Sequence, residues 1–147
     1  MSYKVNSIIQ GNSQQVGINN NHFGNGILRG QYFLQTTSDT PGNILSIPVI
    51  TSPETVIMCN VKIIGIKSDG TSATFGSSEA AAIYTSGSAS SIGTLPIVVL
   101  TSTTLFVPTA SWNVSADTLN FLVFGIAATT INWVCDFEYF TVSSSTG

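Results

Sequence analysis

The fold class is indicated by one stretch near the C-terminus, Ile131-Asn132-Trp133-Val134-Cys135-Asp136-Phe137-Glu138-Tyr139-Phe140-Thr141-Val142. Every second residue from Ile131 to Tyr139 is apolar or aromatic, and most residues between them are polar. A period of two residues is typical of a β-strand with one buried face. Similar shorter runs, separated by turn residues, extend back to about residue 31, so we expect roughly seven to nine short strands. The sequence therefore predicts an all-β fold, an antiparallel β-sandwich of the jelly-roll type.

The composition excludes several classes of protein. Only 7% of the 147 residues are charged, against about 25% in an average globular protein, whereas 43% are hydrophobic. This hydrophobic content is too high for a generally disordered chain. Four basic residues cannot neutralise a run of phosphates, so we expect no nucleic-acid partner. We also expect no membrane insertion and no secretion signal, because the sequence has neither an apolar run of about 18 residues nor an apolar region near its N-terminus.

The first 30 residues differ from the rest of the chain. Much of this segment is rich in Asn, Gln and Gly and shows no strand or helix period. We predict an irregular N-terminal docking arm at residues 1–30 and a β-sandwich head domain at residues 31–147. Val16, Ile18 and Phe23 are the apolar positions that such an arm would use, and a plain flexible tail is the alternative.

Turn residues and apolar runs predict the elements of the head domain. Pro41-Gly42 fits the centre of a type II turn, because proline fixes φ and glycine supplies a positive φ. The longest strand is expected at Val56–Lys67, followed by a hairpin turn at Ser68-Asp69-Gly70-Thr71. Glu79–Tyr84 has some helix propensity, but its position among strands favours a strand. The Ser, Gly and Ala residues from Ser86 to Thr94 indicate a loop.

The last two predicted strands carry apolar residues on both faces. An isolated sandwich should present polar residues outside, so a second buried surface is indicated. The residues predicted to form it, as an oligomer interface, are Leu122, Phe124, Val134 and Phe140. Ile64 and Ile66 are a similar surplus on the longest strand. Another copy of the chain around a symmetry axis is the simplest cover for such a surface. A loop or the N-terminal arm folded over it is the alternative.

Patterns typical of catalytic and metal sites are weak. His22 is the single histidine and lies in the arm, and no Gly-x-Ser-x-Gly motif is present, so a Ser-His-Asp triad is not indicated. Cys59 and Cys135 lie in strand-like runs without a partner at zinc spacing, so no metal site is predicted. We interpret them as two buried free thiols, with a disulfide between strands as the alternative. We expect no cofactor and no enzymatic activity.

Two other features have both a functional and a structural interpretation. Asp136 and Glu138 are two residues apart on one strand and therefore point to the same face. Such a pair could serve glycoside hydrolysis or bind Ca²⁺, but a polar strip beside an interface is the more ordinary interpretation. The aromatic candidates for stacking on sugars are Trp112, Tyr84, Tyr32 and Tyr139. Trp133 is expected to fill the core, and Trp112 is also more simply explained as a core residue.

Three segments of the C-terminal half form a recognisable pattern: Ala110-Ser111-Trp112-Asn113-Val114, Thr118-Leu119-Asn120-Phe121-Leu122-Val123-Phe124-Gly125-Ile126-Ala127, and Thr129-Thr130-Ile131-Asn132-Trp133-Val134. The segments contain, in order, a Trp-Asn-Val step, an alternating strand that ends in Gly-x-Ala, and a strand with Thr-Ile-x-Trp. Together they resemble the terminal β-domain of bacteriophage fibre and appendage proteins. Earlier segments, with Lys67-Ser68-Asp69-Gly70 among them, are similar to the beginning of that domain. The resemblance covers about residues 33 to 142.

The resemblance implies a jelly-roll-like sandwich that forms a homotrimer on the exterior of a virion, and it brings no catalytic residue. The chain departs from the family pattern because it has no long fibre shaft, and because Cys135 and Asp136 stand where small apolar residues are more usual. A short arm with one head suits a capsid-decorating knob or a short fibre. The expected partners are other virion proteins of the capsid or tail, and a host-surface glycan at outward loops. A stand-alone lectin-like carbohydrate-binding module is the alternative function.

Overall fold

The computed structural model describes residues 2–4, 27–49, 54–95, 98–103, 106 and 108–144. Val16, Ile18 and Phe23 of the predicted docking arm lie outside these residues, and so does His22. Within the described ranges the chain forms no helix with the length and apolar character that crossing a membrane requires.

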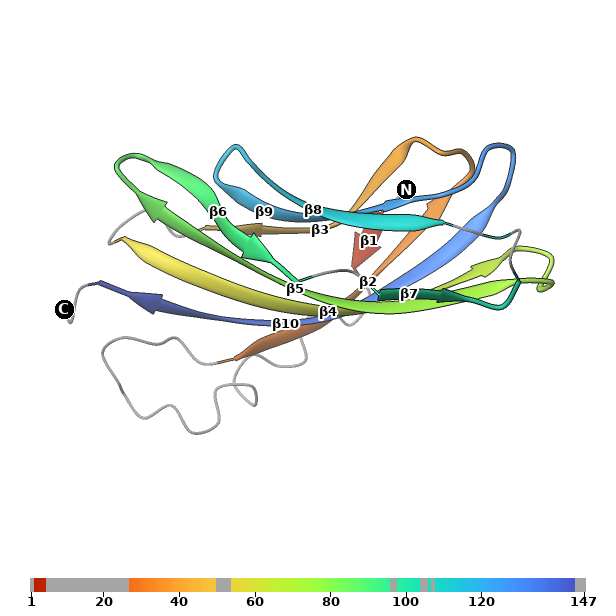
Figure 1. Cartoon of the computed structure of the whole chain (residues 1–147), viewed down its shortest axis with the longest axis horizontal. Coiled ribbons are helices and arrows are strands. Elements are labelled where there is room, and N and C mark those ends of the chain that lie inside the picture. Colours follow the sequence, from red (N-terminus) through yellow and green to blue (C-terminus); the bar gives the residue numbers. More distant parts are fainter. Residues whose placement is uncertain are drawn as a thin grey trace.

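The predicted all-β class is confirmed, because the described residues form strands in two antiparallel sheets that pack face to face (Figure 1). Sheet A has the strand order β1-β2-β10-β4-β5-β6, and β7 also pairs with β5. Its strands are β1 (Ser2–Lys4), β2 (Leu28–Thr36), β4 (Thr55–Lys67), β5 (Ala73–Thr85), β6 (Ser88–Thr94), β7 (Val98–Thr101) and β10 (Ile131–Ser143). Sheet B has the order β3-β9-β8, with the strands β3 (Pro41–Pro48), β9 (Thr118–Phe124) and β8 (Thr109–Ser115). The jelly-roll connectivity is not confirmed.

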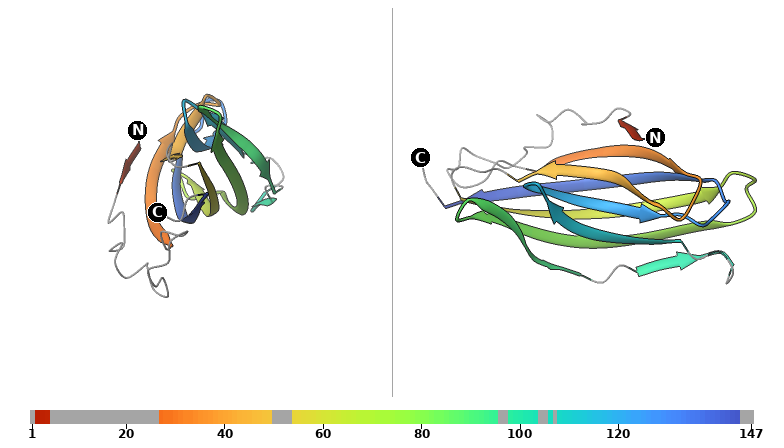
Figure 2. Two further views of the ribbon diagram at one scale, coloured as in Figure 1. Left: turned by 90° about the vertical axis from the view of Figure 1, so that its left-hand side faces the viewer. Right: turned by 90° about the horizontal axis from the view of Figure 1, so that it is seen from above.

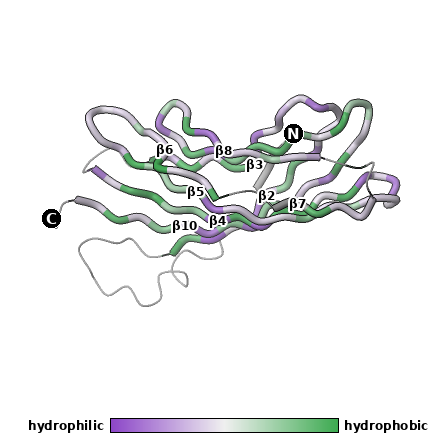
Figure 3. Tube along the Cα trace, in the orientation of Figure 1, coloured by the Kyte–Doolittle hydropathy of each residue, from purple (hydrophilic) through white to green (hydrophobic). Residues whose placement is uncertain are grey.

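The two sheets form an elongated sandwich in which the long strands β4, β5 and β10 run along the whole length (Figure 2). The tube in Figure 3 shows both hydrophobic and hydrophilic residues along these strands. The burial of β4 alternates along the strand, because Ile57, Cys59, Val61 and Ile63 face sheet B and are at most 2% exposed. The predicted strand at Val56–Lys67 is therefore confirmed, and so is the hairpin turn that follows it.

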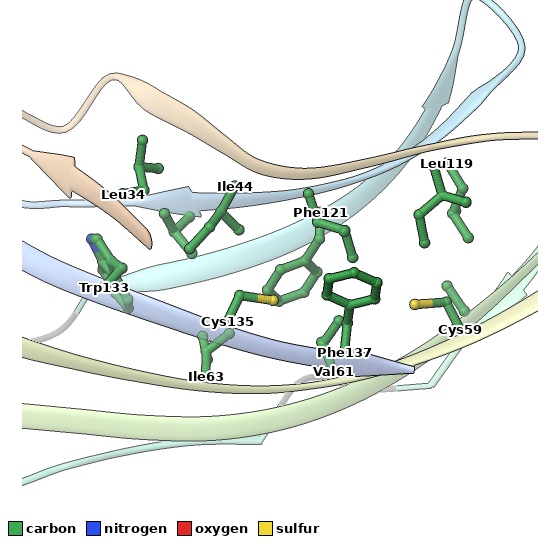
Figure 4. Packing of buried hydrophobic residues seen from close by; sticks show 14 of the residues in the cluster. Leu34, Ile44, Cys59, Val61, Ile63, Leu119, Phe121, Trp133, Cys135 and Phe137 are labelled. Atoms are coloured by element: carbon green, nitrogen blue, oxygen red, sulfur yellow. The ribbon is translucent and has the colours of Figure 1, made fainter. Parts of the chain in front are cut away.

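The core lies between the inner faces of the sheets (Figure 4). The stretch that indicated the fold class forms β10, whose alternate residues Ile131, Trp133, Cys135 and Phe137 are buried as expected. From sheet B, Leu119 and Phe121 of β9 point toward them, and Val123 of the same strand is buried in the same cluster. Cys59 and Cys135 are buried free thiols, as predicted.

Two predicted turns or loops are strands instead. Pro41 and Gly42 are not the centre of a turn but the first residues of β3. A Cβ at residue 42 would lie 2.5 Å from Cδ2 of Leu34, so the glycine allows β3 to approach the Leu34 side chain closely. The segment predicted as a loop from Ser86 to Thr94 is a tight turn followed by β6, which pairs with β5 through its backbone. At the turn, Ser86 and Gly87 both have positive φ, as a two-residue hairpin requires.

Polar contacts also join the two sheets. Nε1 of Trp112 on β8 donates a hydrogen bond to Oγ of Ser78 on β5 at 2.8 Å. At the β8–β9 turn, the carboxylate of Asp117 accepts a hydrogen bond from the backbone N–H of Ala89 on β6 at 2.9 Å. The carbonyl of Asp117 accepts a bond from the N–H of Val49 at 2.8 Å, which continues the β3–β9 pairing within sheet B. The bonds of Trp112 and Asp117 to β5 and β6 therefore link sheet B to the inner side of sheet A.

Candidate functional site

The outer face of sheet A, which points away from sheet B, carries the most unusual surface of the described residues. Registered pairing places one apolar residue from each of five adjacent strands in a line across it. We call this line the first apolar row, and it consists of Phe33 (β2), Val134 (β10), Ile64 (β4), Phe75 (β5) and Leu100 (β7). Ile64, Phe75 and Leu100 are 58%, 55% and 53% exposed. A large exposed apolar patch on a soluble protein usually marks an interaction surface.

A charged strip lies beside this row on the same face. It consists of Arg29, Lys62, Glu79, Asp136 and Glu138. Two of the four basic and three of the seven acidic residues of the chain are therefore concentrated here. In the sheet, Asp136 stands opposite Lys62, and Glu138 stands between Arg29 and Asn60. In a protein with so few charges, this arrangement gives the face a defined electrostatic pattern.

Glu138 is held at both of its carboxylate oxygens. Nδ2 of Asn60 donates a hydrogen bond to Oε1 at 3.1 Å, and Nε of Arg29 donates one to Oε2 at 2.7 Å. The hydrogen bond from Asn60, together with the positive charges of Arg29 and Lys62, lowers the pKa of Glu138. A general acid in glycoside hydrolysis needs a raised pKa, so Glu138 is poorly suited to that role. The carboxylate acts here as a fixed acceptor within the strip.

Beyond the charged strip the face becomes apolar again. Phe140 on β10 stands opposite Met58 on β4, and Met58 stands opposite Ala81 on β5. We call these three residues the second apolar row. Phe140 is 47% exposed, and Val142 at the next outward position of β10 is 46% exposed. Along the strands, the outer face of sheet A therefore carries the first apolar row, then the charged strip, then the second apolar row.

A shallow groove of about 570 Å³ follows the charged strip. Its rim includes the side chains of Arg29, Asn60, Lys62 and Glu138, and Leu95 closes the side next to β5. Polar groups that line a groove can orient a ligand through hydrogen bonds. The groove is therefore a candidate site for a small polar molecule.

The outer face of sheet B is different, because its polar groups bond to one another. Oδ1 of Asn120 accepts hydrogen bonds from Oγ of Ser46 at 2.7 Å and from Oγ1 of Thr118 at 3.1 Å. Its Nδ2 donates to Oδ1 of Asn113 at 2.9 Å. Asn120 is only 6% exposed. This network ties the three strands of sheet B together and leaves Asn120 little capacity for a ligand.

The structure divides the four predicted interface residues between two faces. Val134 and Phe140 belong to the outer face of sheet A, one in each apolar row. Leu122 and Phe124 lie on β9, on the outer face of sheet B, and are half-buried. The four residues therefore do not form one surface, and an interface at either pair stays a prediction.

Other sequence candidates take mostly structural positions. Trp112 is half-buried against the core, with its ring edge-on to Phe121 at a centroid distance of 4.7 Å. Tyr32 stacks on Phe137 at 5.4 Å, and Tyr84 and Tyr139 also pack against the core. Among the described residues, no group of three or more His, Cys, Asp or Glu side chains could hold a metal ion.

Sequence reasoning missed several residues of the outer face of sheet A. Phe33, Phe75, Leu100, Arg29 and Glu79 join it only because β2, β5 and β7 pair with their neighbours in one register. The apolar surplus at Ile64 and Ile66 was a correct signal for this face, and both are exposed. The charges of Arg29 and Glu79 gave no local signal, because each is isolated in its own strand.

No protein-family model and no curated protein gives a significant match to the chain. Among solved structures, the tailspike protein of Acinetobacter baumannii phage AM24 matches with a TM-score of 0.37 and 9% sequence identity. The match covers 81% of this chain and 26% of the tailspike chain. The chain thus spans about a quarter of the length of that protein.

Proposed function

We propose that the chain is a non-enzymatic structural protein of a bacteriophage virion, in which the β-sandwich forms a homotrimeric head on the particle exterior. The predicted arm attaches the head to other virion proteins of the capsid or tail through Val16, Ile18 and Phe23, while residues 2–4 and 28–30 at its two ends belong to strands of sheet A. The head decorates the capsid or ends a short fibre. Three heads held together would raise the avidity of weak contacts with a host-surface glycan, because the second and third contacts become intramolecular.

The observation that carries the self-association is the exposed apolar surface on the outer face of sheet A. Ile64, Phe75 and Leu100 each leave more than half of their surface in solvent. Burying such side chains is worth about 25 cal/mol per Å² of apolar surface, which favours a cover of complementary shape. The bacteriophage assignment is supported by the resemblance of the segments around Trp112, Thr118 and Trp133, which form β8, β9 and the beginning of β10.

Two experiments test this proposal. Light scattering on the purified full chain should return a mass of three times 15.4 kDa, and a mass of 15.4 kDa at working concentration would contradict self-association. An antibody raised against the chain should label the outside of intact phage particles in electron micrographs. Labelling of broken particles alone would contradict an exterior position.

A lectin-like carbohydrate-binding module is the second candidate, and the groove along the charged strip favours it. Arg29, Asn60 and Lys62 supply hydrogen-bond donors there, while the carboxylates supply acceptors. A glycan array probed with the full chain separates the two functions. Binding that is lost in Asn60→Ala and retained in the sheet B variant Asn113→Ala would favour the module, whereas particle association without glycan binding would favour the structural role.

A further inference from the structure

We propose that the partner of the outer face of sheet A is the same face of another copy, related by an axis that runs parallel to the strands above the β10–β4 boundary. This inference rests on the proposed self-association and specifies its geometry. The axis sets the β2–β10 half of one copy against the β4–β5 half of the next. Because the axis is parallel to the strands, each row of one copy meets the row at the same position along the strands of the other copy.

The apolar rows match under this operation. Val134 on β10 faces Ile64 of the next copy on β4, and Phe33 on β2 faces Phe75 of the next copy on β5. In the second apolar row, Phe140 faces Met58 of the next copy. Apolar side chains thus meet apolar side chains on both sides of the charged strip. Sheets that pack through such faces lie about 10 Å apart, with their strands within about 30° of each other.

The charged strip matches as well, and this is the observation that selects the second copy as occupant. Asp136 on β10 faces Lys62 of the next copy, and Arg29 on β2 faces Glu79 of the next copy on β5. Glu138 faces the amide of Asn60 of the next copy. Every charge of the strip therefore meets an opposite charge or a neutral amide. Complementary charges of this kind fix the register of an interface.

The strip also excludes the other simple orientation. An axis lying across the strands, in the plane of the face and centred on the charged strip, would set Asp136 against Glu138 of the next copy. Two carboxylates would then meet at the centre of the interface, which is strongly unfavourable when both are desolvated. With two copies around this axis the faces pack flat on each other. With three copies, as in the proposed homotrimer, the β2–β10 half of each copy meets the β4–β5 half of the next at an angle, and the rows still keep the same positions along the strands.

The test uses two charge reversals in the full chain, Lys62→Asp and Asp136→Lys. Each places like charges across the proposed interface, so each variant alone should dissociate to 15.4 kDa in light scattering, with the dissociation constant raised roughly tenfold or more. An equimolar mixture of the two variants should reassemble into oligomers that contain both chains, detected by native mass spectrometry. Within either variant chain residues 62 and 136 still carry like charges, so rescue in the mixture can arise only between chains.

Controls separate this inference from the proposed function. Asp39→Lys changes the net charge as much as Asp136→Lys but lies in the turn before β3, and it should leave the oligomer intact. Circular dichroism should show that both reversal variants keep their strands, because residues 62 and 136 are exposed. If either variant fails to fold, Phe75→Gln and Ile64→Gln should give the same dissociation.

Three outcomes would overturn the inference. If the wild-type chain is an oligomer that both charge reversals and both glutamine variants leave intact, the face is wrong while the proposed self-association stands. If Leu122→Gln or Phe124→Gln dissociates the oligomer and the sheet A variants do not, the interface lies on sheet B. If the wild-type chain is a monomer, the inference and the proposed self-association fail together, whether or not other residues of the same chain cover this face.

Discussion

The indole of Trp133 lies directly against the backbone of Gly65, its partner on the adjacent strand β4. A Cβ atom at residue 65 would stand 2.8 Å from Cε3 and 2.9 Å from Cζ3 of the ring. Cβ atoms do not approach other heavy atoms so closely, and the ring is 1% exposed and surrounded by core residues. The absence of a side chain at residue 65 therefore allows the largest core side chain to pack against the backbone of β4.

Gly65→Ala should destabilise the protein by about 1–3 kcal/mol, because the added methyl group forces Trp133 or the backbone to shift in a close-packed core. Chemical denaturation monitored by tryptophan fluorescence would measure the change in unfolding free energy. Gly93→Ala is the matched control, since a Cβ there meets no atom within 4 Å. Equal effects of the two substitutions would show that strand propensity, and not contact with Trp133, decides the result.

The same indole makes a polar contact that a second prediction tests. Nε1 of Trp133 donates a hydrogen bond to Oγ1 of Thr36 at 3.0 Å, and both residues are buried. Thr36→Val keeps the shape but leaves the indole N–H without this acceptor, at a cost of about 1–3 kcal/mol. The control is Thr109→Val on the exposed side of β8, which should change stability by less than about 0.5 kcal/mol. A neutral Thr36→Val would mean that the indole N–H finds another acceptor.

The strands with one continuous apolar face could be predicted from the sequence. In β4, β9 and β10 a buried face demands apolar residues at every second position, so local sequence and final structure agree. β6 could not be predicted, because Ser88–Thr94 is mostly exposed and is held by backbone pairing with β5 rather than by apolar side chains. The position of Gly42 in a strand could not be predicted for a related reason. Its close contact is with Leu34, which lies near it only after folding.

The candidate site could be predicted only in part. An apolar surplus on the outer faces was visible at Ile64, Val134 and Phe140, and these residues do share one face of sheet A. The alternation of β9 and β10 does not indicate that the two strands belong to different sheets. Leu122 and Phe124 were therefore predicted to share one surface with Val134 and Phe140, although they lie on the other sheet. Pairing across strands is a long-range property, and it alone brings the charged strip together.

The two buried thiols give a prediction on reactivity. Burial raises the pKa of Cys59 and of Cys135 well above the usual range of a thiol, and the nearby charges of Glu138 and Asp136 add to this effect. The thiolate is the reactive form, so neither residue should react with a disulfide reagent at about pH 8 in the folded protein. Both should react on addition of denaturant. Rapid labelling of one thiol in the native protein would contradict the burial of its strand.

The same pKa shifts make stability depend on alkaline pH. In the unfolded chain a thiol ionises near pH 8.5, whereas in the folded protein both thiols stay protonated. Above about pH 8.5 the unfolded state therefore binds fewer protons than the folded state, and the unfolding free energy falls as the pH rises. The double variant Cys59→Ala and Cys135→Ala should be less stable at neutral pH, but its stability should depend less on pH in this window. An unchanged slope would assign the effect to other groups.

Asp69 in the β4–β5 hairpin gives a prediction at acid pH. Its Oδ1 accepts hydrogen bonds from Oγ1 of Thr71 at 2.6 Å and from the N–H of Thr71 at 2.9 Å, and Nζ of Lys67 lies 3.1 Å from Oδ2. These contacts, the hydroxyl of Thr71 first, lower the pKa of Asp69 to about 2. Because this pKa lies below the unfolded value of about 3.9, the contribution to stability is present above about pH 3.9 and is lost as the pH falls through 2.

Thr71→Val removes the hydroxyl donor and keeps the N–H, so the pKa of Asp69 should rise toward about 3.9. Chemical shifts of the carboxyl carbon, followed by NMR against pH, would measure it directly. Lys67→Gln is the comparison variant and should raise the pKa by less, because the hydrogen bond and the charge of the ammonium group each lower the pKa less than the hydroxyl does. If Lys67→Gln has the larger effect, the ion pair and not the turn hydrogen bonds holds the carboxylate in its charged form.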